Sequence, residues 1–179
     1  MIFVPVVNKE NKPLMPTSPS RARRWIKSGK ATPFWKKGIF CIRLNVESEE
    51  NIQQVALGID PGSKKHGLTV KSASHTYLNV QADAVTWVSS KLEDRSIRRR
   101  SRRNKKTPYR KARRFRAGTS ILPSSKARWD VLLRLANHFS KLFPITDLVV
   151  EDVRAATKEG KRRWNSLFSY IQNGKDYFY

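Results

Sequence analysis

The sequence predicts an α/β fold: a small N-terminal module, then a mixed domain that an arginine-rich helix interrupts. Two short apolar runs, 55–59 and 147–151, are typical of buried strands. Apolar residues recur with a 3.6-residue period from Trp129 to Phe139, which predicts a helix packed against those strands. Between the first strand and this helix lies a dense basic run, 91–117, which is too highly charged to enter a core.

The first 50 residues predict strands arranged around one helix. Ser18 or Ser20 is the expected helix cap, and Gly29 is the expected stop. In chain order the predicted elements are strand 2–7, polar turn 8–11, a helix ending at Ser28, a hairpin of strands 31–35 and 39–46 that turns at 36–38, and an acidic linker 47–51.

The rest of the chain predicts a sheet crossed by two helices. Beyond Arg154 no clear period is found. In chain order the predicted elements are strand 55–59 buried on both faces, turn 60–63, strands 67–71 and 76–82, a helix from about Ala84 to Thr107, a helix capped by Ser124 or Ser125 and ended by Pro144, and buried strand 147–151.

Composition sets broad limits on function. The 179 residues carry a net charge of +23, which favours a polyanionic partner, while 39% hydrophobic residues and five Trp allow a core. A single Cys excludes an internal disulfide framework and a Cys-rich zinc site, and Cys41 is interpreted as a buried strand residue. No run resembles a membrane span or a signal peptide, so we expect no membrane partner and an intracellular location, in the cytoplasm or in an organelle or nucleoid of prokaryotic ancestry.

More than half of the excess charge lies in residues 91–117, with 14 basic and 2 acidic side chains. Arginine outnumbers lysine there, which suits bidentate phosphate contacts better than it suits a merely solvated face or a nuclear-targeting tail, the alternatives. Arg100 and Arg103 are expected to point away from the main basic face. The predicted nucleic-acid contacts are Arg95, Arg98, Arg99, Arg100, Arg102, Arg103, Lys105, Lys106, Arg110, Lys111, Arg113, Arg114 and Arg116, with Arg21, Arg23 and Arg24 in the N-terminal module.

Aromatic residues are interleaved with the basic ones. Stacking on unpaired bases is one interpretation of Trp25, Trp35, Tyr109, Phe115 and Trp164. For Trp25, Trp35 and Phe115 we favour packing within small modules. The three histidines, His66, His75 and His138, lack ligand spacing and are interpreted as structural or surface residues.

Two acids end the two apolar strands. Asp60 follows the first and Glu151 the second, and an acid at a buried strand tip is costly unless it is paired or binds a cation. On neighbouring strands the two would repel, and a divalent cation resolves that conflict. The ordinary alternative is a turn residue before Pro61-Gly62 and a solvated Glu151-Asp152 pair.

The ordered motifs resemble a known family. Residues 58–63 and 148–152 are similar to the first and second motifs of a RuvC-type nuclease of the RNase H-like fold. Lys12 to Pro16 resembles the N-terminal PLMP module of IscB-type RNA-guided nucleases, and residues 98–103 resemble their arginine-rich bridge helix. Arg162-Arg163-Trp164-Asn165 and the terminal 174–179 resemble relatives in the basic RRXRR family.

The resemblance implies catalytic and metal-binding roles for Asp60 and Glu151, with Mg²⁺ or Mn²⁺ as cofactor. It also implies a structured RNA partner of the guide type, with target DNA and other protein subunits as further partners. A ribosomal RNA is the structured partner that we expect if the protein is instead a ribosome-associated subunit. The implied division is a PLMP-like module at 1–50, RuvC-like parts at 51–84 and 118–155, a bridge helix at 85–117 and a basic, aromatic segment at 156–179.

The sequence departs from the family at two places. Thr17-Ser18 stands where the family often has Cys-His, and the 28 residues after Glu151 show no third nuclease motif. We therefore expect an incomplete RNase H-like domain, from a truncated protein or one part of a larger effector, that does not cut DNA alone. The alternatives are a non-enzymatic RNA-binding subunit of a ribonucleoprotein and a transposon-associated DNA-binding accessory protein.

Overall fold

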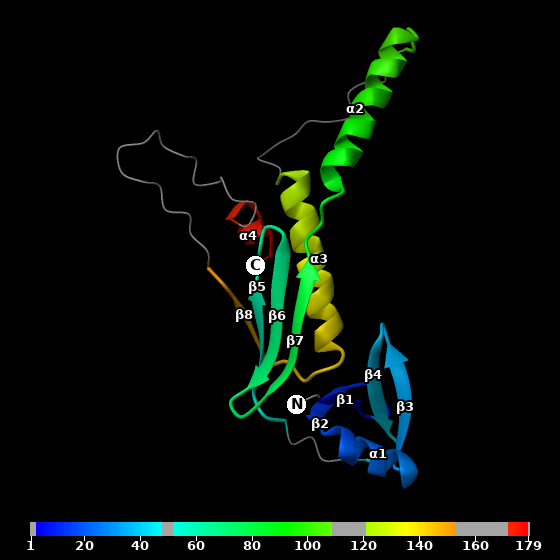
Figure 1. Cartoon of the computed structure of the whole chain (residues 1–179), viewed down its shortest axis with the longest axis vertical. Helices are drawn as coiled ribbons and strands as arrows, with labels where there is room; N and C mark the ends of the chain where they lie inside the picture. Colours follow the sequence, from blue (N-terminus) through cyan, green and yellow to red (C-terminus); the bar gives the residue numbers. More distant parts are fainter. Residues whose placement is uncertain (1–2, 48–51, 109–120, 153–171, 179) are drawn as a thin grey trace, which may run out of the picture. The chain divides into compact units, whose positions relative to one another are not determined.

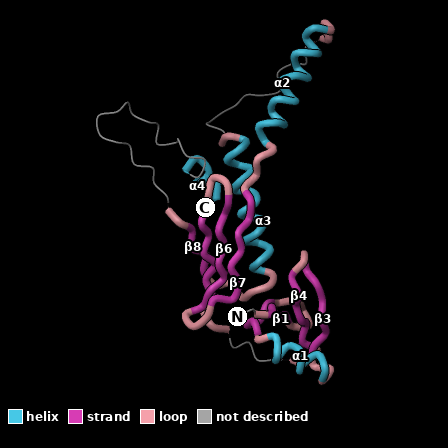
Figure 2. Tube along the Cα trace, viewed as in Figure 1, coloured by secondary structure: helices cyan, strands magenta, loops and turns pink. Residues whose placement is uncertain are grey.

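The computed structural model describes residues 3–47, 52–108, 121–152 and 172–178. Its elements form two four-stranded sheets with helices, which confirms the α/β class (Figures 1 and 2). The chain divides into two compact units, Met1–Asp83 with Leu132–Asp152, and Ala84–Val131 with Val153–Tyr179. No helix in the described part of the chain is long and apolar enough to cross a membrane.

The N-terminal sheet has the order β2-β1-β4-β3, in which β1 and β4 are parallel and the other pairs are antiparallel. Its core is a cluster from the sheet and α1 that includes Ala22, Ile42 and Leu44, with Trp25 packed against it. The elements are β1 (Val4–Val7), β2 (Pro13–Thr17), α1 (Pro19–Lys27), β3 (Ala31–Lys36) and β4 (Ile39–Leu44).

Local signals explain most of this module. Of the two candidate caps, Ser18 is the one used: its Oγ accepts the Arg21 N–H at 3.4 Å. Gly29 ends the helix with φ of +71°. In the β3–β4 turn, Lys37 and Gly38 have φ of +48° and +83°, and two positive φ values are typical of a type I′ hairpin.

The second sheet has the order β7-β6-β5-β8, from β5 (Val55–Asp60), β6 (Lys65–Ser72), β7 (Thr76–Asp83) and β8 (Asp147–Val150). The first three strands form an antiparallel meander, and β8 lies parallel to β5 with Gly58 opposite Val149. The parallel pair is possible because a long connection, containing α2 and α3, returns the chain to the sheet.

Burial in this sheet differs from the prediction. In β5, Val55, Leu57 and Ile59 are buried, but the residues between them are only half-buried, so this strand is covered on one face. In β8, Leu148 and Val149 are 50% and 56% exposed. The prediction of two strands buried on both faces was therefore wrong. An apolar run records side-chain type but not what covers each face of a sheet.

The ends of the two long helices also differ from the predicted ends. α2 (Val88–Asn104) begins four residues after Ala84 and ends before Thr107, where Lys106 adopts a φ of +49° that a helix cannot continue. α3 (Pro123–Ser140) begins at its proline, and the Lys126 N–H donates to the Leu122 carbonyl. Ser124 and Ser125 thus lie inside the first turn, and the prediction that one of them is the cap was wrong.

The seven-residue α4 (Gln172–Phe178) was not predicted. It packs on α3, where the Trp129 and Phe178 ring centroids are 4.9 Å apart. The Tyr177 hydroxyl donates to Asp130 at 2.8 Å, and Lys126 lies over the Tyr177 ring. Gly174 lies so close to the Trp129 indole that a Cβ there would collide with it. This helix therefore depends on contacts distant in sequence.

Candidate functional site

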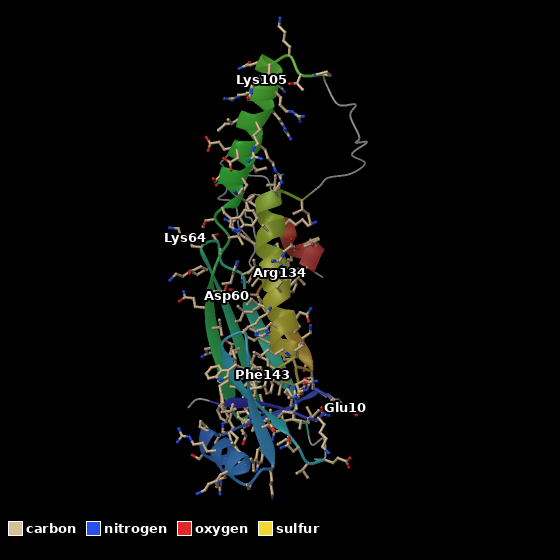
Figure 3. The ribbon with its side chains drawn as sticks, turned by 90° about the vertical axis from the view of Figure 1, so that its right-hand side faces the viewer. Glu10, Asp60, Lys64, Lys105, Arg134 and Phe143 are labelled. Atoms are coloured by element: carbon tan, nitrogen blue, oxygen red, sulfur yellow. The ribbon has the colours of Figure 1, made fainter. Side chains whose placement is uncertain are left out.

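Asp60 and Glu151 lie at adjacent ends of two parallel strands. Ile59 is opposite Val150 in the β5–β8 register, and the Glu151 N–H donates to the Ile59 carbonyl at 2.9 Å. The next residue on β5 is Asp60, which Figure 3 labels. The expectation that the two acids meet on neighbouring strands is confirmed as geometry.

The side chains of these two acids interact with each other. The pKa of Glu151 is raised, first by a hydrogen bond in which its protonated form donates to Asp60, then by the negative charge of Asp60, then by desolvation. Both side chains are exposed, so solvent and ions reach them. The two carboxyl groups also offer oxygen ligands to a cation.

The pair opens on a hollow of about 500 Å³ on the uncovered face of the sheet, lined by Gly58, Ile59, Asp60, Gly67, Thr69, Val149 and Glu151. Gly67 faces Asp60 across the β5–β6 register, and a Cβ at Gly67 would lie 3.4 Å from Asp60 Cβ and 3.5 Å from its Oδ2. The glycine therefore leaves open the space beside the carboxylate. Gly62 is required for a different reason, because a Cβ there would collide with the Lys65 carbonyl.

The two acids fit one divalent cation as ligands. Carboxylate oxygens suit Mg²⁺, which usually keeps several waters when only one or two carboxylates hold it. In the described ranges no group of three or more His, Cys, Asp or Glu converges, so a two-cation centre is not assembled there. Asp83 ends β7 opposite Lys65, and Asp130 is bonded to Tyr177, so neither residue serves this pair.

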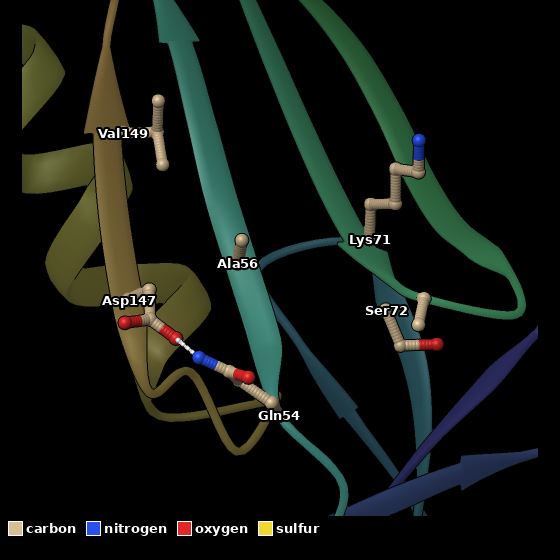
Figure 4. A pocket seen from close by; sticks show the side chains of 7 residues that line it. Gln54, Ala56, Lys71, Ser72, Asp147 and Val149 are labelled. Carbon is tan, nitrogen blue, oxygen red and sulfur yellow. Dashed lines mark hydrogen bonds between the residues drawn. The ribbon is translucent and has the colours of Figure 1, made fainter.

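A second hollow, of about 400 Å³, lies toward the other end of the same sheet face, beside Ala56, Lys71 and Val149 (Figure 4). The acid at this hollow, Asp147, already accepts hydrogen bonds from neighbouring side chains. Asp147 accepts from Thr146 at 2.7 Å and from Gln54 at 2.9 Å, and these bonds lower its pKa. The Thr146 N–H donates to the Val55 carbonyl as well, so this cluster anchors β8 to β5 and sets the register that brings Glu151 to Asp60.

The arginine-rich segment forms the helix α2, and Val88 is its buried residue. Arg95, Arg98, Arg99, Arg100, Arg102 and Arg103 are all exposed, and the side chains project from the helix as Figure 3 shows. At 100° per residue Arg95, Arg98, Arg99 and Arg102 share one face, and Arg100 lies opposite. One ion pair within the helix, Lys91 with Asp94 at 3.8 Å, engages none of the arginines.

The remaining predicted contacts fall into three groups. Lys105 and Lys106 are exposed and follow the end of α2, so they do not continue its helical face. Arg21, Arg23 and Arg24 are exposed on α1. Those outside the described residues are Arg110, Lys111, Arg113, Arg114 and Arg116, together with Tyr109, Phe115 and Trp164.

Two smaller predictions have clear outcomes. Cys41 is fully buried in β4, as predicted, and burial raises the pKa of its thiol to about 11 despite the positive charge of Lys36. Trp25 packs against the core as predicted, but Trp35 is 70% exposed, so its interpretation as a packing residue was wrong. The turn lysines directly after Trp35 were the available signal that it lies at a surface.

The family described as RRXRR protein matches residues 4–170. The chain belongs to the RRXRR family. The pattern in that description, two arginines on each side of any residue, occurs in this sequence at Arg99–Arg103, on α2. A search of curated proteins finds no significant match to this chain.

Proposed function

We propose that this RRXRR protein binds nucleic acid through α2, and that the ligand is a structured RNA. The observation that carries the proposal is the helix itself: 17 residues, six exposed arginines and one buried residue. Such a helix has no apolar face for a core, and its charge is best neutralised by closely spaced phosphates. Arginine can also stack on bases and bind phosphate with two parallel hydrogen bonds.

RNA is favoured over duplex DNA by the family resemblance. The chain resembles IscB-type RNA-guided nucleases, whose bridge helix lies along a guide RNA and its heteroduplex, and such a duplex is recognised through backbone and shape. Within this proposal the protein is a member of that lineage, with target DNA and other protein subunits as further partners. The RNase H-like identity of the second sheet belongs to the same proposal.

The Asp60–Glu151 pair would hold one Mg²⁺ or Mn²⁺. Such a cation, when bound, polarises a phosphodiester oxygen and lowers the pKa of a bound water. The residues supply oxygen ligands at an open hollow beside Gly67, and because the pKa of Glu151 is raised, protons compete with a cation for this site. In this proposal the site is part of a nuclease centre that the described residues do not complete.

The test is to identify the nucleic acid that co-purifies with the full chain, at low salt and without nuclease. One discrete, highly structured RNA would support the proposal, and ribosomal RNA would favour a ribosome-associated subunit. Protein recovered free of nucleic acid, with no affinity for added RNA in a mobility-shift titration, would refute it. Duplex DNA bound more tightly than RNA would favour a transposon accessory protein.

A second candidate is an RNA-binding subunit without catalysis. It is favoured by the presence of two converging acids, not three, in the described ranges. The two candidates differ in one observable: substitution of Asp60 should change cation binding in the first and have no functional consequence in the second.

A further inference from the structure

The β3–β4 hairpin carries an exposed indole that the core does not use. Trp35 is 70% exposed and pairs across the hairpin with Phe40, at 5.4 Å between ring centroids and 66° between planes. Side chains alternate along a strand, so Trp35 shares a face with Ala31, which belongs to the core cluster together with Ala22 of α1. The hairpin extends past the cluster, so Phe40 holds the indole in place while most of it stays open.

Positive charge gathers at the tip of the same hairpin. Lys36 is the last residue of β3, Lys37 lies in the turn that follows, and Lys141 follows the C-terminal end of α3. The pKa of His138 on α3 is lowered, first by burial and then by the charges of Lys37, Lys36 and Lys141, so all three positive charges act on one imidazole. His138 Nε2 is buried and has no hydrogen-bond partner among the described residues.

These lysines are not neutralised within the described part of the chain. The ion pair found there joins Lys91 to Asp94, and it involves none of the three. Side chains alternate along β3, so Lys36 points to the face of the hairpin opposite to Trp35. Lys37 lies in the turn that joins β3 to β4. A phosphodiester chain that crosses the tip of the hairpin would therefore meet the Trp35 indole on one face. It would meet the lysine ammonium groups in the turn and on the other face.

We propose that the hairpin tip is a second nucleic-acid contact, separate from α2, that takes an unpaired nucleotide: its base stacks on Trp35, and the flanking phosphates lie against Lys36, Lys37 and Lys141. An exposed aromatic ring beside basic groups is how proteins bind single strands without sequence preference. A base within a duplex has both faces covered by its neighbours, so the indole selects an unpaired segment. The inference rests on the proposed function only in that the ligand is nucleic acid.

The test compares two probes that differ in whether they carry bases: a short single-stranded uridine oligonucleotide and inorganic polyphosphate. Affinities are measured with the full wild-type chain and with a full chain that carries Arg98→Ala and Arg102→Ala in α2. The comparison separates the contribution of the hairpin tip to affinity from the contribution of α2. Trp35→Leu removes the ring and keeps an apolar side chain, whereas Trp35→Phe keeps a ring. Lys37→Gln removes charge at the tip.

The expected result is a loss of affinity for the oligonucleotide of roughly five- to 150-fold in Trp35→Leu, with most of the affinity kept in Trp35→Phe. Polyphosphate binding should not change in either, and Lys37→Gln should weaken both probes. Equal binding of the oligonucleotide by Trp35→Leu and the wild type would overturn the inference, and so would an equal loss for both probes. If only the α2 substitutions weaken RNA binding, the proposed function stands and this inference fails; if only the tip substitutions do, the reverse holds.

Discussion

The sharpest prediction concerns which side of α2 meets phosphate. Arg98 and Arg102 lie four residues apart and within about 40° of each other around the helix. Arg100 lies on the opposite side of the helix, and Arg103 lies between that side and the side of Arg98 and Arg102. We compare two double variants that remove the same charge: Arg98→Ala with Arg102→Ala, and Arg100→Ala with Arg103→Ala. All four arginines are exposed, so neither variant should change the fold.

The magnitude follows from counterion release. Each phosphate contact contributes about 0.7 to the slope of log affinity against log salt for a single strand and about 0.9 for duplex DNA. Loss of two contacts should therefore reduce the slope by about 1.4 to 1.8 in the Arg98/Arg102 variant. Over a fourfold rise in salt this corresponds to a roughly tenfold smaller drop in affinity than the wild type shows. The Arg100/Arg103 variant should keep nearly the wild-type slope.

The assay is fluorescence anisotropy with a labelled form of the co-purifying RNA, at a series of salt concentrations, for both variants and the wild type. Equal losses of slope in the two variants would mean that nucleic acid surrounds the helix, and would refute the one-sided contact. An unchanged slope in both would place the binding surface elsewhere, with α1 and the β3–β4 hairpin as the next regions to test.

Three further predictions test the site and the fold. The pKa of Glu151 is raised, first by its hydrogen bond to Asp60 and then by the negative charge of Asp60, so the pair destabilises the native state as pH rises above about 4.5. Asp60→Asn should therefore raise the melting temperature at neutral pH. Added Mg²⁺ or Mn²⁺ should stabilise the wild type, and this stabilisation should be lost in Asp60→Asn. The pKa of His138 is lowered in the native state, first by burial and then by the charges of nearby lysines, so the unfolded chain takes up a proton before the folded chain does. The free energy of unfolding should therefore fall as pH decreases through about 6.5. His138→Gln should flatten this dependence in urea melts between about pH 7.5 and about pH 5.5, and an equally steep loss in the variant would contradict the prediction. Phe178 is buried against Trp129, so Phe178→Ala should destabilise the unit that contains α4 by about 3 kcal/mol. Tyr177→Phe removes one exposed hydrogen bond to Asp130 and should cost about 1 kcal/mol or less. Equal urea midpoints for the two variants would show that the α3–α4 contact contributes little.

The features that were predictable from sequence depend on local patterns and on strand order. An apolar strand, a long helical connection and a second apolar strand predict a parallel pair, and a parallel pair brings Asp60 to Glu151. Cys41 was predictable because it alternates with apolar neighbours. Strand β2 was missed because prolines at 13 and 16 argue against a strand, but β2 lies at the edge of its sheet, where missing N–H groups are tolerated.

The features that were not predictable depend on what lies across from a residue. Val149 is exposed because it points to the uncovered face of the sheet, and Leu148, which points to the other face, is exposed because β8 is an edge strand. Trp35 is exposed because its hairpin is longer than the cluster that α1 covers. α4 is only seven residues long, too short to be stable alone, and exists through Trp129. No local pattern carries this information.

The last prediction is that this chain does not cleave DNA by itself. Two-cation hydrolysis needs enough ligands to hold both ions about 4 Å apart while they stabilise the attacking and leaving oxygens. Asp60 and Glu151 are the acids that meet at the hollow, and the described residues bring no third His, Cys, Asp or Glu to them. With two carboxylates Mg²⁺ keeps most of its water and binds weakly, and substrate phosphate alone would have to supply the remaining ligands. The measurement is nicking of a supercoiled plasmid and cutting of a single strand by the purified protein with its RNA and Mg²⁺ or Mn²⁺, beside Asp60→Ala. Cation-dependent cutting by the wild type that disappears in Asp60→Ala would overturn the prediction, and it would mean that a ligand outside the described residues completes the centre.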